Sequence, residues 1–435
     1  MLSFAYGCNK NYYNEKEGVF LSMSHTTQPL PLVEQKHAAR VNPRIFLLAL
    51  GMFALGTDAF VVAGVLPVIA KETGVTEALA GQLVTAFSLT YGLGAPVLVV
   101  LTGSFSRNRV LLAALGAFCL SNIGSALAPN FPALLLTRIL VGCCAAVFGP
   151  LAYTIGATLA PPEKRGQALA LVASGFTLST VLGLPLGTWI GEHFGWRLSF
   201  SLVAGLSGAA FTMLLLWGLP KATETPALSL RARLAPIKEQ RLLLALIPAL
   251  LWNLGIYMVY TYIAPLLQQN LHTTDVSPFL LAYGLGPALG NWVVGVIIDR
   301  VGSTRPIFVF LVGLLIVEPL LALTTHSVLG ALLTLFLWGA CVPMLFTPQQ
   351  HRLLRLAPEH ANVLLALNNS TFYLGIAGGA ALGGLALRVV AVTQLGWIGA
   401  GGVLLALVLF AFSVRLGEHK RQEKSSVAVF THVSE

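Results

Sequence analysis

The fold of this chain follows from the run GFTLSTVLGLPLGTWIG, residues 175–191. Small residues fall at every fourth position of this run, at Gly175, Ser179, Gly183, Gly187 and Gly191. Positions four apart share one face of an α-helix, so these residues form a smooth stripe along which a second helix can approach backbone to backbone. Pro185 removes one hydrogen bond inside this helix and predicts a bend there.

The stripe has a second copy in the other half of the chain, at Thr371, Gly375, Gly379 and Gly383. The offset between the copies is constant, since 379 − 183 and 383 − 187 both give 196. The residues before the stripes match at the same offset, because Pro162-Glu163 corresponds to Pro358-Glu359. A repeat of nearly half the chain predicts two copies of one folding unit rather than two unrelated domains.

The composition is that of a membrane protein. Hydrophobic residues make up 56% of the 435 residues and charged residues only 10%, whereas soluble domains carry about 25% charged residues. Apolar runs of about 20 residues are long enough to cross a bilayer. Twelve are expected, at 45–70, 79–103, 109–128, 132–159, 166–190, 196–219, 241–268, 276–298, 305–324, 328–349, 360–387 and 391–414. The sequence therefore predicts an all-α integral membrane fold of twelve transmembrane helices in two pseudo-symmetric halves of six.

The repeat divides the chain into five parts. These are a disordered N-terminal tail, a six-helix half, a linker, a second six-helix half and a C-terminal tail, at 1–43, 44–219, 220–240, 241–416 and 417–435. The linker contains three prolines and four basic residues and is too short for a folded domain, so it suits a hinge.

Lys and Arg are distributed unevenly among the loops. The net charge is +9, but the basic residues are scattered over short loops instead of gathered on one face, which argues against binding of nucleic acid. Most lie in the tails and in the loops after even-numbered spans, while the opposite side holds only Lys71, Arg197 and Arg388. The positive-inside rule predicts a multi-pass protein of the inner or plasma membrane, embedded in the lipid bilayer with both termini in the cytoplasm.

Motifs for enzymatic chemistry are missing from the sequence. The five cysteines show no CxxC spacing, and most lie inside apolar spans, so they read as packing residues rather than metal ligands or a disulfide framework. Neither a Walker A motif nor HExxH occurs. We therefore predict no enzyme activity, no metal and no cofactor, and ATP is not the energy source.

Two residues of opposite charge fall within the first and fourth apolar spans. Asp58 comes 14 residues after Arg44, about 21 Å along a helix, and Arg138 comes 6 residues after Pro132, about 9 Å from the other side. Both therefore lie in the outer half of a bilayer core about 30 Å thick. Because intramembrane charges usually mark transport pathways, we expect them to face a common cavity and to interact directly or through a substrate. A structural ion pair, or an arginine reaching out to the interface, is the alternative.

Polar and aromatic residues on three further spans form the predicted substrate cavity: Gln82, Thr85, Tyr91, Asn253, Tyr257, Tyr260, Asn369 and Tyr373. This mixture suits flat or amphipathic molecules. Hydrogen bonding between packed helices, or an interfacial aromatic belt, is the alternative. Glu318, before Pro319 in the ninth span, is either a second proton site or a lone group near the outer rim.

A charged turn follows the eighth span, in the run GVIIDRVGSTR that contains Gly295, Asp299, Arg300, Gly302 and Arg305. An aspartate at the end of one helix and an arginine at the start of the next can latch the two helices by charge-assisted hydrogen bonds. A solvated surface loop is the alternative. The equivalent loop after the second span, GSFSRNR, has Ser106 where the acid would stand.

Taken together, residues 43–416 resemble the major facilitator superfamily. Within it they are most similar to the twelve-helix drug and metabolite:proton antiporters, especially the bacterial purine, sugar and chloramphenicol efflux pumps. GTDAFVVAGVLP (56–67) resembles the motif of the first span, and GVIIDRVGSTR resembles the latch between the eighth and ninth spans. Gly183-Leu184-Pro185-Leu186-Gly187 resembles the antiporter motif of the fifth span. Two departures are Ala59, where many relatives have Glu, and Leu184, which separates glycine from proline in the broader form of the antiporter motif.

The resemblance implies a monomeric, proton-driven exporter of small organic molecules, such as drugs, nucleobases or sugars, that works by alternating access. Arg138 falls on the fourth-span arginine that supports proton coupling in the family, and Asp58 would carry the proton. Gly183, Pro185, Gly187 and the latch would carry the conformational change, with the glycine stripes of the fifth and eleventh spans as the sliding seam. The alternative function is a proton symporter or facilitator that imports a small nutrient. A membrane enzyme or a sensor has no motif in its favour.

Overall fold

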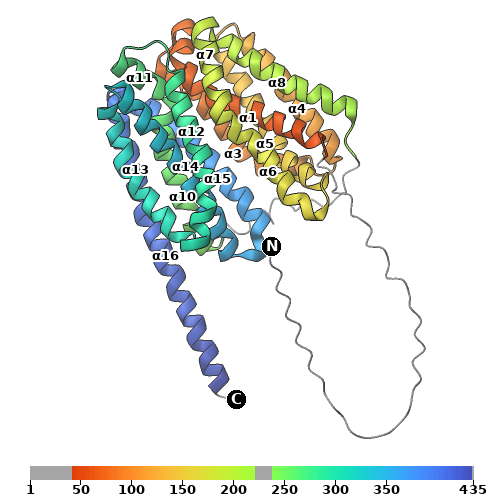
Figure 1. Ribbon diagram of the computed structural model, residues 1–435, viewed down its shortest axis with the longest axis vertical. Helices are drawn as coiled ribbons and strands as arrows, with labels where there is room; N and C mark the ends of the chain where they lie inside the picture. The colour runs from red at the N-terminus through yellow and green to blue at the C-terminus, as the bar shows by residue number, and fades with distance from the viewer. Residues whose placement is uncertain (1–41, 221–237, 434–435) are drawn as a thin grey trace, which may run out of the picture. The chain divides into compact units, whose positions relative to one another are not determined.

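The computed structural model describes residues 42–220 and 238–433, and over this part the chain forms helices joined by turns (Figure 1). The first half contains α1 (Arg44–Thr73), α2 (Glu77–Ala80), α3 (Gln82–Leu101), α4 (Arg107–Ala126), α5 (Phe131–Thr158), η1 (Pro162–Lys164), α6 (Arg165–Leu178), η2 (Ser179–Gly183), α7 (Leu184–Phe194) and α8 (Trp196–Trp217). The second half contains α10 (Gln240–Thr261), α11 (Ile263–Leu271), α12 (Ser277–Val301), α13 (Thr304–Thr324), α14 (Val328–Leu356), η4 (Pro358–His360), α15 (Ala361–Ala386), η5 (Val392–Gln394) and α16 (Leu395–Val433).

Each half supplies six spans, and the predicted all-helical membrane fold is confirmed. Within the described ranges, 11 helical segments are long and apolar enough to cross a membrane. The remaining expected span is α15, whose mean hydropathy is lowered by its glycines and by the polar run from Asn368 to Thr371. It packs along α10 and α3, both of which are among the 11, and so lies within the bundle.

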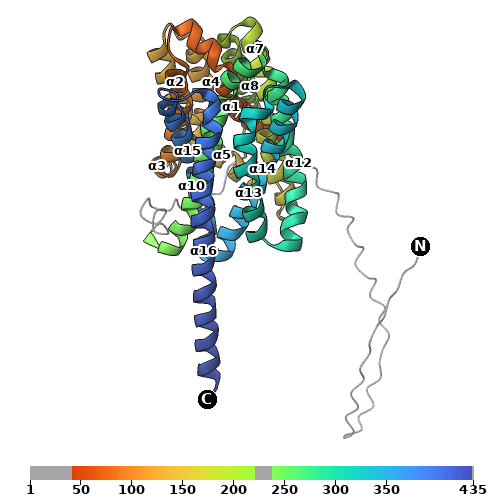
Figure 2. The ribbon, with the colours of Figure 1, turned by 90° about the vertical axis from the view of Figure 1, so that its left-hand side faces the viewer.

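The N-terminal tail (1–43) and the linker (220–240) fall almost entirely outside the described residues. The C-terminal tail, expected from 417, instead continues α16 as a helix to Val433. Figures 1 and 2 both show this helix extending beyond the others.

Both glycine stripes pack inside their own half. A side chain at Gly175 would collide with the carbonyl oxygen of Ala49, so the stripe of α6 and α7 lies directly on the backbone of α1. A Cβ at Gly379 would lie 2.5 Å from the carbonyl oxygen of Leu254 and 2.7 Å from the nitrogen of Met258, so the second stripe lies on α10. The stripes therefore join the fifth span to the first and the eleventh to the seventh by close packing. They do not form the seam between the halves that the sequence led us to expect.

Pro185 shapes the fifth span differently from a simple bend. It has no N–H to donate to the preceding turn, and the chain accommodates this with the π-helical turn η2, directly before α7. Such turns are rare and occur often at functional sites. Here the turn brings the carbonyl oxygen of Thr180 against Gly284 of α12, which belongs to the other half. Contact between the halves at this point therefore depends on the π turn and on a glycine outside the stripes.

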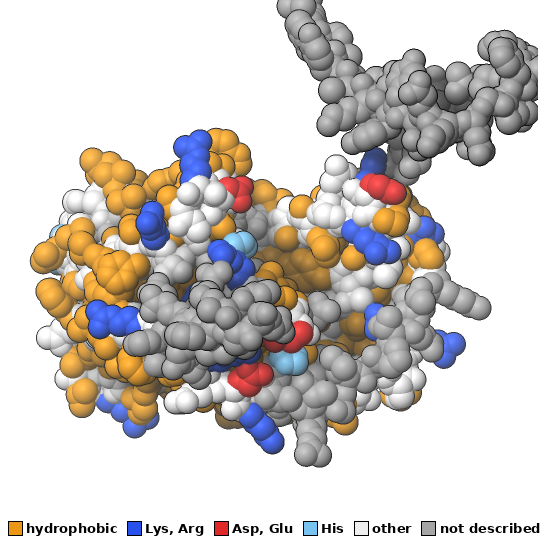
Figure 3. Space-filling view, turned by 90° about the horizontal axis from the view of Figure 1, so that it is seen from below, with side chains coloured by type: hydrophobic (Ala, Val, Ile, Leu, Met, Phe, Trp, Pro, Cys, Tyr) orange, Lys and Arg blue, Asp and Glu red, His pale blue; other side chains and the backbone are white. Residues whose placement is uncertain are grey.

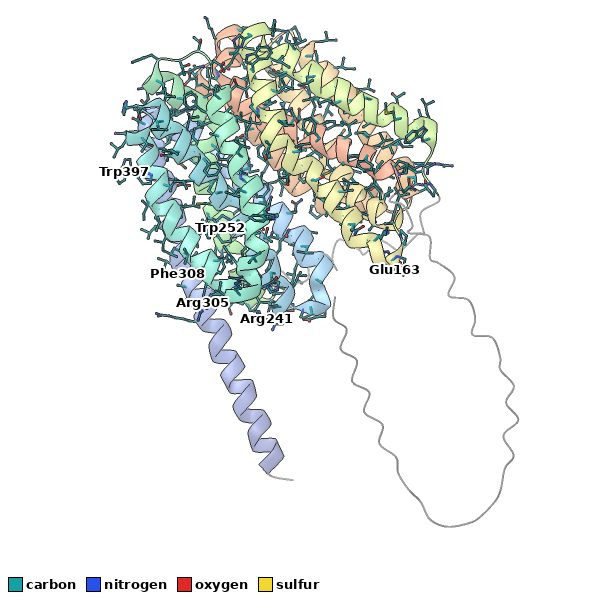
Figure 4. The ribbon with its side chains drawn as sticks, in the orientation of Figure 1. Glu163, Arg241, Trp252, Arg305, Phe308 and Trp397 are labelled. Carbon is teal, nitrogen blue, oxygen red and sulfur yellow. The ribbon has the colours of Figure 1, made fainter. Side chains whose placement is uncertain are left out.

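We call one end of the bundle the terminal face, because α1 begins there and α8 ends there. Here Arg44, at the start of α1, donates hydrogen bonds to the carbonyl oxygens of Gly218 (2.7 Å) and Trp217 (2.9 Å) at the end of α8. Figure 4 shows Arg241 and Arg305 at this end of the second half, with Trp397 farther toward the other end. We call that other end the opposite face.

The two halves meet toward the opposite face. The N–H of Val276, directly before α12, donates to the carboxylate of Glu192 in α7 at 3.1 Å, and α2 packs against α15. Seen from the terminal face, Figure 3 shows a hollow with hydrophobic walls. The structure is therefore closed at the opposite face and hollowed at the terminal face.

Candidate functional site

Asp58 and Arg138 form a buried ion pair between α1 and α5. Nη1 of Arg138 donates to Oδ1 of Asp58 at 2.8 Å, and Nη2 donates to the backbone oxygen of Asp58 at 3.3 Å. The exposed fractions of the two side chains are 0% for Asp58 and 1% for Arg138. The pair forms because α1 and α5 run in opposite directions and bring the two charges to the same depth. Direct contact is one of the two arrangements expected from the sequence.

Aromatic rings enclose the guanidinium group. Its central carbon lies 4.9 Å from the ring centroid of Phe87 and 5.5 Å from that of Phe200, and a cation over a ring face is stabilised electrostatically. With these rings in place, neither charge borders an open cavity in this conformation. That differs from the common cavity we expected, because the long side chain of Arg138 reaches the acid directly and leaves no space between them.

The ion pair is incompletely satisfied. Oδ2 of Asp58 and Nε of Arg138 have no hydrogen-bond partner in the described part of the chain. Attraction between buried charges offsets their desolvation only when the remaining hydrogen-bonding positions are also filled. Protonation of Asp58 would remove the attraction, so a single proton can decide whether these two helices stay joined at this point.

Phe60, two residues after Asp58, connects the segment of the ion pair to the second half. Its ring lies 5.9 Å from that of Tyr260 in an edge-on arrangement and 6.5 Å from that of Tyr257, nearly parallel to it. The hydroxyl of Tyr260 donates to the backbone oxygen of Phe60 at 3.5 Å. The segment of α1 that holds the acid is therefore in contact with α10.

A second aromatic contact leads from the arginine to the second half. Tyr91 of α3 and Tyr373 of α15 stack with ring centroids 3.7 Å apart and planes 20° apart. Phe87, which covers the guanidinium of Arg138, lies 6.3 Å from each of them. Aromatic pairs of this kind contribute about 0.5–1.5 kcal/mol beyond the area they bury. Both members of the ion pair are thus linked through rings to helices of the other half.

The predicted cavity residues divide into two groups. The four tyrosines lie in the aromatic cluster just described, and Asn369 interacts with the hydroxyl of Tyr91. The other three lie elsewhere. Gln82 lines a pocket of about 230 Å³ beside Arg388, Asn253 donates to Ala249 of its own helix at 2.6 Å, and the buried hydroxyl of Thr85 has no partner among the described residues. For Asn253, the structure favours helix packing, since Gly375 of α15 lies directly on its Cβ.

Sequence reasoning missed several members of the cluster, among them Phe60, Phe87, Tyr283, Trp338 and Phe372. Two of them carried a usable signal. Phe60 lies inside the first-span motif, and Phe87 precedes Tyr91 by four residues and so shares its helix face. The other three cannot be told from lipid-facing or interfacial aromatics by spacing alone.

The charged turn after α12 forms no latch in this conformation. Asp299, Arg300 and Arg305 are exposed, and none of them takes part in the ion pairs of the described residues. Exposed charges gain little by pairing in water, and the terminal face on which they lie is hollowed. The turn itself is shaped by Gly302, whose φ of 77° is accessible to glycine at little cost.

Asp275 is a second acidic residue at the opposite face, beside Glu192. Asp275 accepts hydrogen bonds from the N–H (2.9 Å) and the hydroxyl (2.5 Å) of Ser277, at the start of α12. Burial raises the pKa of Asp275, but the hydrogen bonds from Ser277, together with a hydrogen bond to Glu192 and the nearby His193, outweigh burial and hold its pKa below the ordinary value of 3.8. The ionised acid thereby supports the helix start whose neighbour, Val276, binds Glu192 of the other half.

With this geometry established, comparison with known proteins is informative. Residues 48–380 match the family model described as Major Facilitator Superfamily. The chain is 33% identical to the uncharacterized MFS-type transporter YbcL of Bacillus subtilis, over 84% of this chain and 94% of that protein. It is 33% identical to the inner membrane transport protein YdhP of Escherichia coli, over 86% of this chain and 97% of that protein. It is 32% identical to a probable sugar efflux transporter of Helicobacter pylori, over 88% and 97%.

Solved structures show the same fold. The chain superposes on a mutant of the nucleoside transporter NupG with a TM-score of 0.68 at 13% identity, over 86% of this chain and 100% of that one. It superposes on the human organic anion transporter MFSD10 with a TM-score of 0.62 at 19% identity, over 85% and 98%. Since the family model covers well over half of the chain, the protein described here belongs to the major facilitator superfamily and is a multi-pass membrane transporter, not an enzyme.

Proposed function

We propose that this secondary transporter exports small organic molecules in exchange for protons. The basic loops support placing the terminal face on the cytoplasmic side of the inner membrane. On that assignment the structure is an inward-facing state, ready to take a molecule from the cytoplasm. A proton arriving from outside would later neutralise Asp58, release the substrate and permit return to this state.

The observation that carries the proposal is the buried pair of Asp58 and Arg138, bonded at 2.8 Å and linked through aromatic rings to the second half. Neutralising one member removes the attraction between α1 and α5. Because Phe60 and Phe87 contact α10 and α15, a shift at the pair changes the contacts between the halves. This is the physical link that coupling of a proton to alternating access requires.

Two observations favour export over import. The fifth span carries Gly183-Leu184-Pro185-Leu186-Gly187, which resembles the antiporter motif, and relatives from Helicobacter pylori bear the name probable sugar efflux transporter. The stacked pair of Tyr91 and Tyr373 would suit flat rings or the apolar faces of sugars. A proton symporter that imports a nutrient is the competing proposal on the same fold.

The test uses the full chain in proteoliposomes of known orientation, with labelled arabinose, adenine and chloramphenicol as probes. An entrapped pH-sensitive dye reports proton movement. We expect at least one probe to move against the direction of protons. Movement of a probe in the same direction as protons would favour the import proposal, and absence of coupled movement for all three would contradict the proposed export of these classes.

Asp58→Asn then tests the role of the acid. We expect coupled proton movement to fall to the level of empty liposomes, because the amide cannot carry the proton. The matched control is Glu359→Gln, which removes an exposed acid at the terminal face. Full proton-coupled export by Asp58→Asn would refute the role of Asp58.

A further inference from the structure

The second half contains an acid that the mechanism above does not use. Glu318 lies in α13 and is 0% exposed. Its carboxyl group faces α16, where a Cβ on Gly399 would lie 2.9 Å from Oε2, and the backbone of Gly396 packs directly on that of Glu318. The carboxyl group therefore occupies space that is available only because α16 has glycine there.

Neither carboxyl oxygen of Glu318 has a hydrogen-bond partner in the described part of the chain. The indole N–H of Trp338 lies nearby but does not reach hydrogen-bond geometry, and it too lacks a partner. The titratable groups that face Glu318 are Cys341 of α14 and Tyr283 of α12. Gly399 of α16 lies beside the carboxyl group, next to Gly255 and Val259 of α10.

No cation in the described ranges pairs with Glu318. An isolated charge in a buried site costs several kcal/mol, even after relaxation of the surroundings, whereas a neutral acid costs far less. We infer that Glu318 is a second proton-binding site of this transporter and holds a proton in the conformation described here. This inference deepens the proposed proton-coupled function and rests on it for its physiological role.

The corresponding helix of the first half, α4, has a buried amide instead of a buried acid. Asn122 of α4 is 0% exposed, and its amide donates to the backbone oxygen of Phe118 at 3.1 Å. Helix α4 therefore carries a buried polar group that cannot take up a proton, whereas α13 carries one that can.

Aromatic contacts connect Glu318 to the first half. Trp338 lies 6.4 Å from Tyr260 and 5.3 Å from Tyr283, between ring centroids. Tyr260 in turn donates to the backbone oxygen of Phe60, two residues from Asp58. Gain or loss of a proton at Glu318 would act first on Trp338 and then on the contact that Tyr260 makes with α1.

The position of Glu318 provides a route for its proton. It lies six residues before Thr324, where α13 ends, about 9 Å along the helix. Gly396 is the second residue of α16, so both helix ends beside the carboxyl group lie toward the opposite face. Trp397, next to Gly396, marks this region in Figure 4. Opening of the opposite face would bring water within reach of Glu318.

Infrared difference spectroscopy of the purified full chain tests the inference directly, with the proton itself as the probe. At pH 7 we expect the carbonyl band of a protonated carboxylic acid in the wild type and in Asp58→Asn. The intensity of this band should fall in Glu318→Gln and stay unchanged in the control Glu359→Gln. Identical spectra for the wild type and Glu318→Gln in this region would overturn the inference. If the glutamine variant fails to fold, Glu318→Asp replaces it, and a shifted band is required.

A transport measurement tests the link to coupling. With whichever of arabinose, adenine and chloramphenicol is transported, Glu318→Gln should lower the number of protons moved per molecule, and Glu359→Gln should not. An unchanged ratio would overturn the role of Glu318 in coupling. Failure of the proposed function can be told apart from failure of this inference, because the infrared band is measured without transport. If none of the three probes is transported, the band of Glu318 should still be observed.

Discussion

The two halves of this transporter share a helical framework but hold their buried acids in different ways. In the first half Asp58 is paired with Arg138 at 2.8 Å, while in the second half Glu318 has no hydrogen-bond or ion-pair partner among the described residues. No ion pair joins α10 to α14 within the described ranges, so the pair has no counterpart in the second half. The glycine stripes, in contrast, recur in both halves, and each packs on a helix of its own half.

The helix packing is therefore shared by the two halves, whereas their buried charged groups differ. Close packing of the fifth span on the first, and of the eleventh on the seventh, needs only small residues and tolerates any charge elsewhere. The charge state of the first half depends on both a proton and an arginine, whereas that of the second half depends on a proton alone. A repeated fold can therefore carry two unlike proton sites.

The largest effect is expected for Arg138→Gln, which makes Asp58 resemble the unpaired Glu318. Removing one member of a buried ion pair costs about 3–5 kcal/mol, because the other charge is left without compensation. We expect a lower unfolding temperature and loss of coupled transport, measured by thermal unfolding in detergent and by the proteoliposome test.

The double variant Asp58→Asn with Arg138→Gln sharpens this result. It removes both charges, so it should regain much of the lost stability without regaining coupled transport. If Arg138→Gln alone were as stable as the wild type, the pair would contribute nothing to the packing of α1 on α5, and the contrast between the halves would disappear.

An intermediate effect is expected where the repeated stripes meet different neighbours. An added methyl group at Gly379 would press on backbone atoms of Leu254 and Met258, which cannot move aside. At Gly183 it would press on the side chain of Thr57, which can change rotamer. Gly379→Ala should therefore lower stability by about 1–3 kcal/mol and Gly183→Ala by less.

Thermal unfolding of the two alanine variants makes this measurement. The control is Gly166→Ala, since no atom lies within 4 Å of a Cβ at that position. Equal losses at Gly379 and Gly183 would show that the two stripes pack more alike than their neighbours indicate.

The smallest effect is expected for Asp275→Asn, which weakens the closure between the halves. Because the pKa of Asp275 is lowered on folding, its contribution to stability is present above the ordinary value of 3.8 and is lost as pH falls through the lower folded value. At pH 7 the variant should lose less than about 1 kcal/mol, since the acid is partly exposed and screened. The difference in unfolding temperature between the wild type and the variant should be present at pH 7 and should shrink as pH is lowered below 3.8. A constant difference would contradict this assignment.

Much of the fold was predictable because it depends on local patterns. Apolar runs of about 20 residues define spans in any context, and the repeat at Gly183 and Gly379 predicted two similar halves. The pairing of Asp58 with Arg138 was within reach for the same reason, because helix rise converts sequence position into depth.

The rest of the site could not be predicted, because it depends on which helix faces which. Asn253 and Tyr257 lie one helical turn apart, yet Asn253 donates to its own helix while Tyr257 joins the aromatic cluster. The missed residue Trp338 belongs to a cluster that gathers rings from α10, α12 and α14. The sequence pattern of a single helix does not specify which aromatic rings of other helices it will contact.

The sequence by itself determined that twelve spans form two related halves and that two opposite charges lie at one depth, since hydrophobic length and helix rise are local properties. Tertiary structure alone decided that the stripes pack within a half, that rings enclose Arg138, and that Glu318 has no partner in the part of the chain that the structure describes. Those outcomes depend on contacts between residues far apart in the chain, which only the packing of all the helices determines.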